Sequence, residues 1–256
     1  MSQTAEPIRL NSETLEAFQA YVDEAEAAMR AVADAALWAD ADPKRAAEVA
    51  GGKVLAQFWS GNKPIHVSEG LIHDWIGATF IPKVHVAQVL EVLQDYDNHK
   101  KIYQPDVIDS KLLARNGNAF KIFLRFLKKK VISVVLDTEH DVHYEQISPM
   151  RWTCWSHTTR ISEVQNAGAK DEKILAPDSG HGFLWRLNSY WQLEEKPDGV
   201  SIECRAISLT RDIPSGLAWI IDPIVRKLPM ESLINTLKAT RKALHLAEAS
   251  VGSDLE

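Results

Sequence analysis

The segment GHGFLWRLNSYWQLEEKPDGVSIECRAISLTR, residues 180–211, decides the fold prediction for this chain of 256 residues. Two runs rich in apolar and aromatic residues, 183–195 and 199–211, flank a Pro-Asp-Gly turn at 197–199. This composition is typical of a tight turn, so the two runs are predicted to pair as an antiparallel hairpin. Because side chains alternate between the two faces of a strand, one face is mainly apolar. Its members are Trp185, Leu187, Trp191, Leu193, Val200, Ile202, Cys204 and Ala206.

The opposite face of the hairpin carries polar side chains, among them Arg186, Glu203 and Arg205. Cross-strand neighbours of opposite charge can form ion pairs, so we predict a solvated outer ladder with a structural role. Two alternatives stay open: an N-terminal helix covers this face, or the alternation is reversed and Arg186 reaches a cavity to hold an anionic group. On the apolar face, small residues such as Cys204 and Ala206 either leave room for a ligand or let a helix approach closely.

Further strand-like runs precede the hairpin. They lie at 53–60, 69–82, 107–115, 119–127, 131–145 and 150–163, with a helical segment at 83–105 between the second and the third. Consecutive strands with short links form antiparallel sheets, so we predict one antiparallel sheet of at least seven strands. The run at 150–163 has a tryptophan of each parity, Trp152 and Trp155, so its inner face stays unassigned.

Helices are predicted at both ends of the chain. A helix at 12–36 begins at the candidate cap Ser12. Near the C-terminus, Pro223 and Pro229 are expected to divide the sequence into a short apolar segment, 215–228, and a long helix over about 230–246. That long helix carries one apolar stripe, which must be buried against the concave side of the sheet: Leu233, Leu237, Thr240 and Leu244.

The order of these elements resembles that of the helix-grip superfamily, which includes START lipid-transfer domains, polyketide cyclases and birch-pollen-allergen-like proteins. The resemblance covers about residues 53–246 and is carried by four segments: GLIHDWIGATFIP, DYDNHKKIYQPDVIDSKLL, GFLWRLNSYWQLEE and SLTRDIPSGLAWIIDPIVRKLPMESLINTLKATRKAL. It implies an α+β fold in which a curved sheet surrounds the long C-terminal helix. We therefore expect an N-terminal helical extension at 1–50, the helix-grip domain at 51–248 and a tail at 249–256.

The resemblance implies a cavity between the sheet and the helix, with a small hydrophobic or amphipathic ligand such as a lipid, a sterol, an isoprenoid or an aromatic polyketide. Binding, or carrying, such a ligand is the preferred hypothesis. One alternative is a cyclase or lyase in which His140 or a tyrosine moves protons, because this fold hosts both binders and enzymes. Another is a protein-interaction module with a filled core. The candidate ligand-binding residues are Trp75, Tyr96, Tyr103, His140, Trp185, Trp191, Cys204 and Trp219.

Several other functions are disfavoured by the sequence. The formal net charge is −6, whereas nucleic-acid-binding domains usually have a basic surface. His140 and His143 point to opposite faces of one strand and the two cysteines lie far apart, so no metal site and no disulfide framework is expected. No cofactor is predicted either. The segment DSGHG at 178–182 precedes a strand rather than a helix, which favours a flexible loop at the cavity mouth over a phosphate site.

The N-terminal sequence shows neither the basic nor the apolar region of a signal peptide. We therefore expect a cytoplasmic protein, or a periplasmic or secreted one if the chain is a processed form. An exposed apolar patch within 215–228 would suit transient contact with a membrane or a partner, and burial is the alternative. The oligomeric state is left open.

Overall fold

The computed structural model describes residues 8–32, 35–59, 61, 63–129, 133–212 and 218–253, and in the last range it describes side chains only at 228–246. The helices are α1 (Ser12–Ala31), α2 (Pro43–Ala50), α3 (Val86–Gln94), the 3-10 helix η1 (Tyr96–Asn98), α4 (His99–Ile102) and α5 (Ala218–Ser253). The strands are β1 (Ile8–Arg9), β2 (Leu55–Phe58), β3 (Ile65–Val67), β4 (Gly70–Pro82), β5 (Val107–Asn116), β6 (Ala119–Lys129), β7 (Ser133–Ser148), β8 (Arg151–Gln165), β9 (Lys173–Ile174), β10 (Ser179–Gly180), β11 (Arg186–Lys196) and β12 (Gly199–Arg211).

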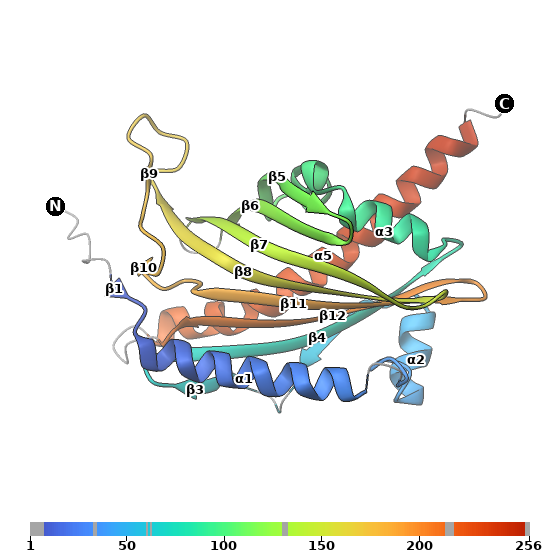
Figure 1. The fold of residues 1–256 in the computed structure, drawn as a ribbon, viewed down its shortest axis with the longest axis horizontal. Coiled ribbons are helices and arrows are strands. Elements are labelled where there is room, and N and C mark those ends of the chain that lie inside the picture. Colours follow the sequence, from blue (N-terminus) through green and yellow to red (C-terminus); the bar gives the residue numbers. More distant parts are fainter. Residues whose placement is uncertain are drawn as a thin grey trace.

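Ten strands form one antiparallel sheet with the order β2-β4-β12-β11-β8-β7-β6-β5, in which β3 also pairs with β4 and β9 with β8. The two short strands β1 and β10 pair separately. Figure 1 shows α5 crossing one face of this sheet, while α1 runs along the other face. The predicted α+β helix-grip fold, with a sheet of at least seven strands around a long C-terminal helix, is confirmed.

The C-terminal helix packs on the sheet through the predicted stripe, and Leu233, Leu237 and Leu244 are all buried. The helix approaches the sheet closely at Gly77 in β4, where an added Cβ atom would lie 2.9 Å from Leu237 Cδ1 and 2.9 Å from the carbonyl oxygen of Leu55. No real Cβ atom tolerates such distances without a shift of its neighbours. The absence of a side chain at position 77 therefore lets α5 rest directly on β4.

The prediction that prolines divide this region was wrong. Residues Ala218–Ser253 form a single helix that includes both Pro223 and Pro229. Proline removes one backbone donor and crowds the preceding turn, at a cost of about 3 kcal/mol in a helix interior. Such a cost weakens a helix locally, but it does not fix the residue at which the helix begins.

The N-terminal helix covers the outer face of the β11–β12 hairpin. Asn11, rather than the predicted Ser12, caps α1 by accepting a hydrogen bond from the backbone N–H of Thr14. Phe18 and Val22 on α1 then pack in an apolar cluster with side chains of the outer face: Ile72, Trp185, Tyr190, Ile207 and Leu209. The alternative in which an N-terminal helix covers this face is thus the one that the structure shows.

The predicted solvated ladder was therefore wrong, because Glu203 and Arg205 are only 3% and 5% exposed. Arg205 donates two hydrogen bonds to the carboxylate of Asp74, which also accepts one from the hydroxyl of Tyr21 on α1. Glu203 accepts hydrogen bonds from the backbone N–H groups of Trp38, at 2.9 Å, and Ala39, at 2.6 Å. The alternation predicted for β12 was correct, but Trp38 and Ala39, which cover Glu203, lie more than a hundred residues away in the sequence.

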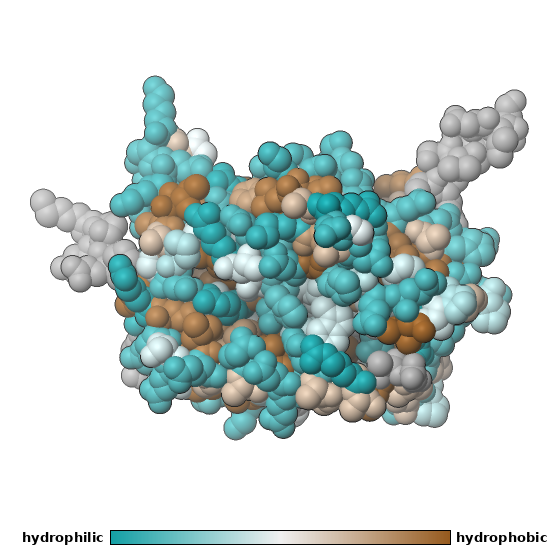
Figure 2. All heavy atoms as spheres, in the orientation of Figure 1, coloured by the Kyte–Doolittle hydropathy of each residue, from teal (hydrophilic) through white to brown (hydrophobic). Residues whose placement is uncertain are grey.

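On the face shown in Figure 2, hydrophobic and hydrophilic side chains are interspersed. The large apolar side chains that are more than two-fifths exposed include Ile108 and Leu113 on β5 and Ile174 on β9. Scattered apolar side chains of this kind are ordinary on a folded surface. None of the described helices is long and apolar enough to cross a lipid bilayer. Of the segment 215–228, which was predicted to form either an exposed apolar patch or a buried one, the side chains at 215–227 lie outside the described residues.

Replacing Gly77 by alanine should destabilise the protein by about 1–3 kcal/mol, because the new methyl group forces α5 or β2 away from β4. Urea denaturation measures the change. The control is Gly117→Asn, at a turn where φ is +58° and nothing lies within 4 Å of an added Cβ atom. It should alter stability by less than about 0.5 kcal/mol. An unchanged midpoint for Gly77→Ala would contradict the close contact.

The stability of the protein should depend on the protonation of Glu203. Burial raises the pKa of this carboxyl group to about 7, although two backbone N–H groups oppose the shift. The folded protein therefore favours the protonated carboxyl group. The resulting contribution to stability is fully present at a pH below the ordinary pKa of 4.5, and it is lost as the pH rises through about 7. The free energy of unfolding of wild type relative to Glu203→Gln should fall by about 2–3 kcal/mol between about pH 5 and about pH 8. A difference that is constant over this range would contradict the prediction.

Candidate functional site

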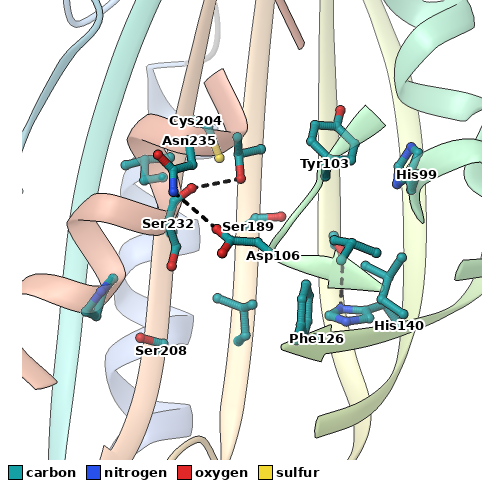
Figure 3. A pocket seen from close by; sticks show the side chains of 18 of the residues that line it. His99, Tyr103, Asp106, Phe126, His140, Ser189, Cys204, Ser208, Ser232 and Asn235 are labelled. Carbon is teal, nitrogen blue, oxygen red and sulfur yellow. Dashed lines mark hydrogen bonds between the residues drawn. The ribbon is translucent and has the colours of Figure 1, made fainter. Parts of the chain in front are cut away.

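A cavity of about 500 Å³ lies between α5 and the concave face of the sheet. Its walls come from β6, β7, β8, β11, β12, the α4–β5 region and the segment that precedes β11. Figure 3 shows that Ser232 and Asn235 on α5 lie on one side of it, whereas Tyr103, Phe126 and His140 lie on the other. One side of α5 rests on β4, near one edge of the sheet. The cavity lies between the other side of α5 and the sheet.

The floor of the cavity is a row of small side chains. Ser156 on β8 is paired with Ser189 on β11, and Ser189 is paired with Ala206 on β12. Neighbouring strands lie about 4.8 Å apart, so three small residues in register leave a continuous trough about 10 Å wide. The adjacent row, Cys154, Trp191 and Cys204, also lines the cavity.

The main polar group on the cavity wall is His140 on β7, which is only 3% exposed. Its Nε2 atom lies 2.9 Å from the Oγ1 atom of Thr138, and its Nδ1 atom lies 3.4 Å from the Oγ atom of Ser156. Burial, with a smaller contribution from His157, lowers the pKa of His140 to about 4. The imidazole is therefore neutral near pH 7.

The other hydroxyl and thiol groups of the cavity are also uncharged. Burial raises the pKa of Tyr103 to about 12 and that of Cys154 to about 12. It likewise raises the pKa of Tyr96, whose hydroxyl lies 2.9 Å from that of Tyr144. Thiols in this state are poor nucleophiles. Burial lowers the pKa of His99, at the same end of the cavity, to about 4. The Nε2 atom of His99 donates a hydrogen bond to the carbonyl oxygen of Leu93.

One ion pair lies at the cavity rim. The Nζ atom of Lys128 on β6 is 2.8 Å from the carboxylate of Asp106, just before β5. Asn235 on α5 donates a longer hydrogen bond, 3.4 Å, to the same carboxylate. The pair therefore joins the sheet to the helix at the rim, and its two charges offset each other.

The segment DSGHG lies beside the cavity, because the next residues, Phe183 and Leu184, line it. The segment is held by the buried carboxylate of Glu163 on β8. That carboxylate accepts hydrogen bonds from the backbone N–H groups of His181 and Gly182, and from the His181 ring. Gly182 has a φ of +78°, and a Cβ atom there would meet the Cβ atom of Arg211 at 2.5 Å. The mouth segment is thus fixed by a carboxylate rather than left free.

Five of the eight predicted site residues lie together on the cavity wall: Tyr96, Tyr103, His140, Trp191 and Cys204. Trp75 instead packs in the core of the same face, with its ring 3.8 Å from that of Phe58. Trp185 lies under α1, because β11 begins at Arg186 and the strand alternation does not extend back to position 185. The side chain of Trp219 lies outside the described residues.

Sequence reasoning missed Ser156, Ser189 and the rim pair of Asp106 and Lys128. The inner face of 150–163 was unassigned, and the structure now shows that Cys154 and Ser156 face the cavity while Trp155 packs against Tyr190 on the outer side. Pairing this strand with residues 186–196 was the signal that could have resolved the ambiguity. The rim pair, in contrast, depends on the path of the chain between α4 and β5.

Comparison with known proteins shows similarity at the level of solved structures. No family model matches the sequence, and no curated protein matches it. A STAR-related lipid transfer protein from Xanthomonas axonopodis is 20% identical, with 71% of this chain and 96% of that chain covered and a TM-score of 0.47.

Two further structures are similar in the same way. The Zhui aromatase/cyclase from a Streptomyces species is 11% identical, with coverages of 68% and 94% and a TM-score of 0.46. A START superfamily protein from Mycobacterium smegmatis is 12% identical, with coverages of 69% and 98% and a TM-score of 0.43. At these identities and scores the likeness carries no functional argument, and the fold assignment rests on the strand order and the position of α5.

Removing the charge of Glu163 should release the mouth segment without unfolding the protein. In Glu163→Gln, at least one backbone N–H loses its acceptor, which costs about 1–3 kcal/mol. Amide hydrogen exchange at residues 181–183 should therefore become about 10- to 100-fold faster. Glu172→Gln is the matched control, because Glu172 accepts a backbone hydrogen bond from Gly168 in an exposed neighbouring loop. Equal exchange at 181–183 in wild type and Glu163→Gln would contradict this role.

Proposed function

We propose that this protein binds, and carries, one small hydrophobic or amphipathic molecule in the cavity between α5 and the sheet. The observation that supports the proposal is a partly open cavity of about 500 Å³ that is lined mainly by apolar side chains, with a few uncharged polar groups and one ion pair. Ligand pockets in proteins typically measure about 300–1,000 Å³ and have this composition. The volume favours a single-chain or polycyclic molecule.

The binding energy would come chiefly from removing apolar ligand surface from water. Each 100 Å² of buried apolar surface contributes about 2.5 kcal/mol, and the loss of ligand freedom opposes binding. A pre-formed cavity reduces that opposition, because the row of Ser156, Ser189 and Ala206 leaves the space open without any rearrangement of the sheet.

Binding is favoured over catalysis by the state of the polar groups. A general base works best when its pKa lies near the working pH, whereas burial lowers the pKa of His140 to about 4. The cavity thiols and phenols are held in their protonated forms by burial. A cyclase or lyase would need at least one group poised to exchange a proton. The cavity volume of about 500 Å³ also argues against an interaction module with a filled core.

Filling the cavity should weaken ligand binding strongly and leave the protein folded. Ala206→Phe places an aromatic ring in the trough, at an overpacking cost of about 1–3 kcal/mol. Binding of N-phenylnaphthylamine, an uncharged fluorescent probe, should be saturable in wild type and at least about tenfold weaker in this variant. Ala114→Phe is the matched control, because Ala114 is an exposed strand residue on β5.

The control variant should bind the probe as wild type does, and circular dichroism should show that all three proteins are folded. Absence of saturable binding to wild type, or equal binding by folded Ala206→Phe, would contradict the proposed function.

A further inference from the structure

The hydrogen bonds around His140 fix which of its ring nitrogens carries the proton. Thr138 has a single hydroxyl proton, and its Oγ1 atom donates it to the carbonyl oxygen of Leu124 at 2.9 Å. The Oγ1 atom of Thr138 also lies 2.9 Å from Nε2 of His140. Because the hydroxyl proton is already used, the ring N–H at Nε2 donates and Oγ1 accepts in this contact. In a neutral imidazole the other nitrogen is then an acceptor. His140 consequently presents the lone pair of Nδ1 toward Ser156.

The partner of that lone pair is loosely placed. The Oγ atom of Ser156 is 3.4 Å from Nδ1, at the long end of hydrogen-bond distances. Both residues line the cavity. Ser156 belongs to the row of small residues on the floor, so the space in front of the two groups is open. An acceptor nitrogen and a rotatable hydroxyl thus stand side by side at the cavity wall.

The hydroxyl groups of two pairs near the cavity, Tyr103 with Thr240 and Tyr96 with Tyr144, are, in contrast, engaged within the protein. The hydroxyl of Thr240 donates to the carbonyl oxygen of Thr236, so the 3.1 Å contact between Tyr103 and Thr240 uses the proton of Tyr103. Tyr144 donates to the carbonyl oxygen of Leu93, so its 2.9 Å contact with Tyr96 uses the proton of Tyr96. The hydroxyl protons of Tyr103 and Tyr96 are thus used in hydrogen bonds within the protein. Between Nδ1 of His140 and the hydroxyl of Ser156 there is only the one long contact.

The charges around the cavity favour an uncharged ligand. Among the lining residues that the structure describes, the one lysine, Lys128, is paired with the one carboxylate, Asp106, at the rim. A buried carboxylate or phosphate without a cationic partner is strongly disfavoured. An anionic end group would therefore find no free cation among these residues.

We propose that the cavity selects an uncharged, largely apolar molecule whose polar end is a hydroxyl group, an alcohol or a phenol. This inference rests on the proposed function. The ligand hydroxyl donates its proton to Nδ1 of His140 and accepts a hydrogen bond from the hydroxyl of Ser156. A ketone or an ester can accept from Ser156 but cannot donate to His140, and a carboxylate adds a charge.

The test uses four fluorescent probes with the same apolar body: pyrenyldodecanol, dodecylpyrene, pyrenyldodecanoic acid and the methyl ester of that acid. Near pH 8, wild type should bind the alcohol about three- to tenfold more tightly than the hydrocarbon, as expected for one net hydrogen bond. The acid should bind at least about tenfold more weakly than its uncharged methyl ester.

Three variants locate the preference. His140→Phe keeps an aromatic ring but removes the acceptor, and Ser156→Ala removes the neighbouring hydroxyl. Both should bind the alcohol and the hydrocarbon with nearly equal affinity. Ser208→Ala is the control, because Ser208 also lines the cavity but lies across it from His140 (Figure 3). It should keep the wild-type preference for the alcohol.

The outcomes separate the two proposals. The inference is overturned if the acid binds as tightly as the alcohol, or if the alcohol preference survives in Ser156→Ala and in folded His140→Phe. Binding of all four probes without discrimination would leave the carrier function standing while contradicting the choice of a hydroxyl. Failure of wild type to bind any of the four would overturn the proposed function, and the inference with it.

Discussion

The contact between α5 and β4 at Gly77 sets how the helix lies against the sheet. Leu237 and Leu233 of the helix occupy the space that a side chain at position 77 would need. The helix is thereby seated at one margin of a curved, ten-stranded sheet. The cavity lies beside this contact, where small residues of β8, β11 and β12 line the space between the sheet and the helix. One close approach thus creates both the anchor of the helix and the cavity.

The buried polar groups differ between the two faces of the sheet. On the outer face, Arg205 and Asp74 are buried as a pair under α1, and Glu203 is held by backbone N–H groups. Tyr21 on α1 donates a hydrogen bond to the same Asp74 carboxylate, which links the N-terminal helix to the sheet. On the cavity face, the polar groups around His140 are neutral and offer hydrogen bonds without charge. The charged groups beneath α1 therefore support the scaffold, while His140 and Ser156 on the cavity face are available to a ligand.

Much of the fold could be predicted from the sequence because it depends on local patterns. The strand positions, the alternation in 199–211 and the stripe of α5 all follow from periodicity. The burial of Glu203 could not be predicted, because residues 38 and 39 cover it from a distant part of the chain. The trough was missed for a similar reason, since Ser156 and Ser189 meet only through the register of two strands. Trp185 was misplaced because β11 begins at Arg186, the residue after it, and not at residue 183 as predicted.

The central claim is that the space beneath α5 is a ligand site and not a region of loose packing. A crystal structure of the protein grown with pyrenyldodecanol tests this claim most directly. We predict density for one probe molecule over the row of Ser156, Ser189 and Ala206, with its hydroxyl oxygen within hydrogen-bond distance of His140 Nδ1. A structure in which α5 has moved toward the sheet and closed the cavity, or in which the probe lies only on the outer surface, would contradict it.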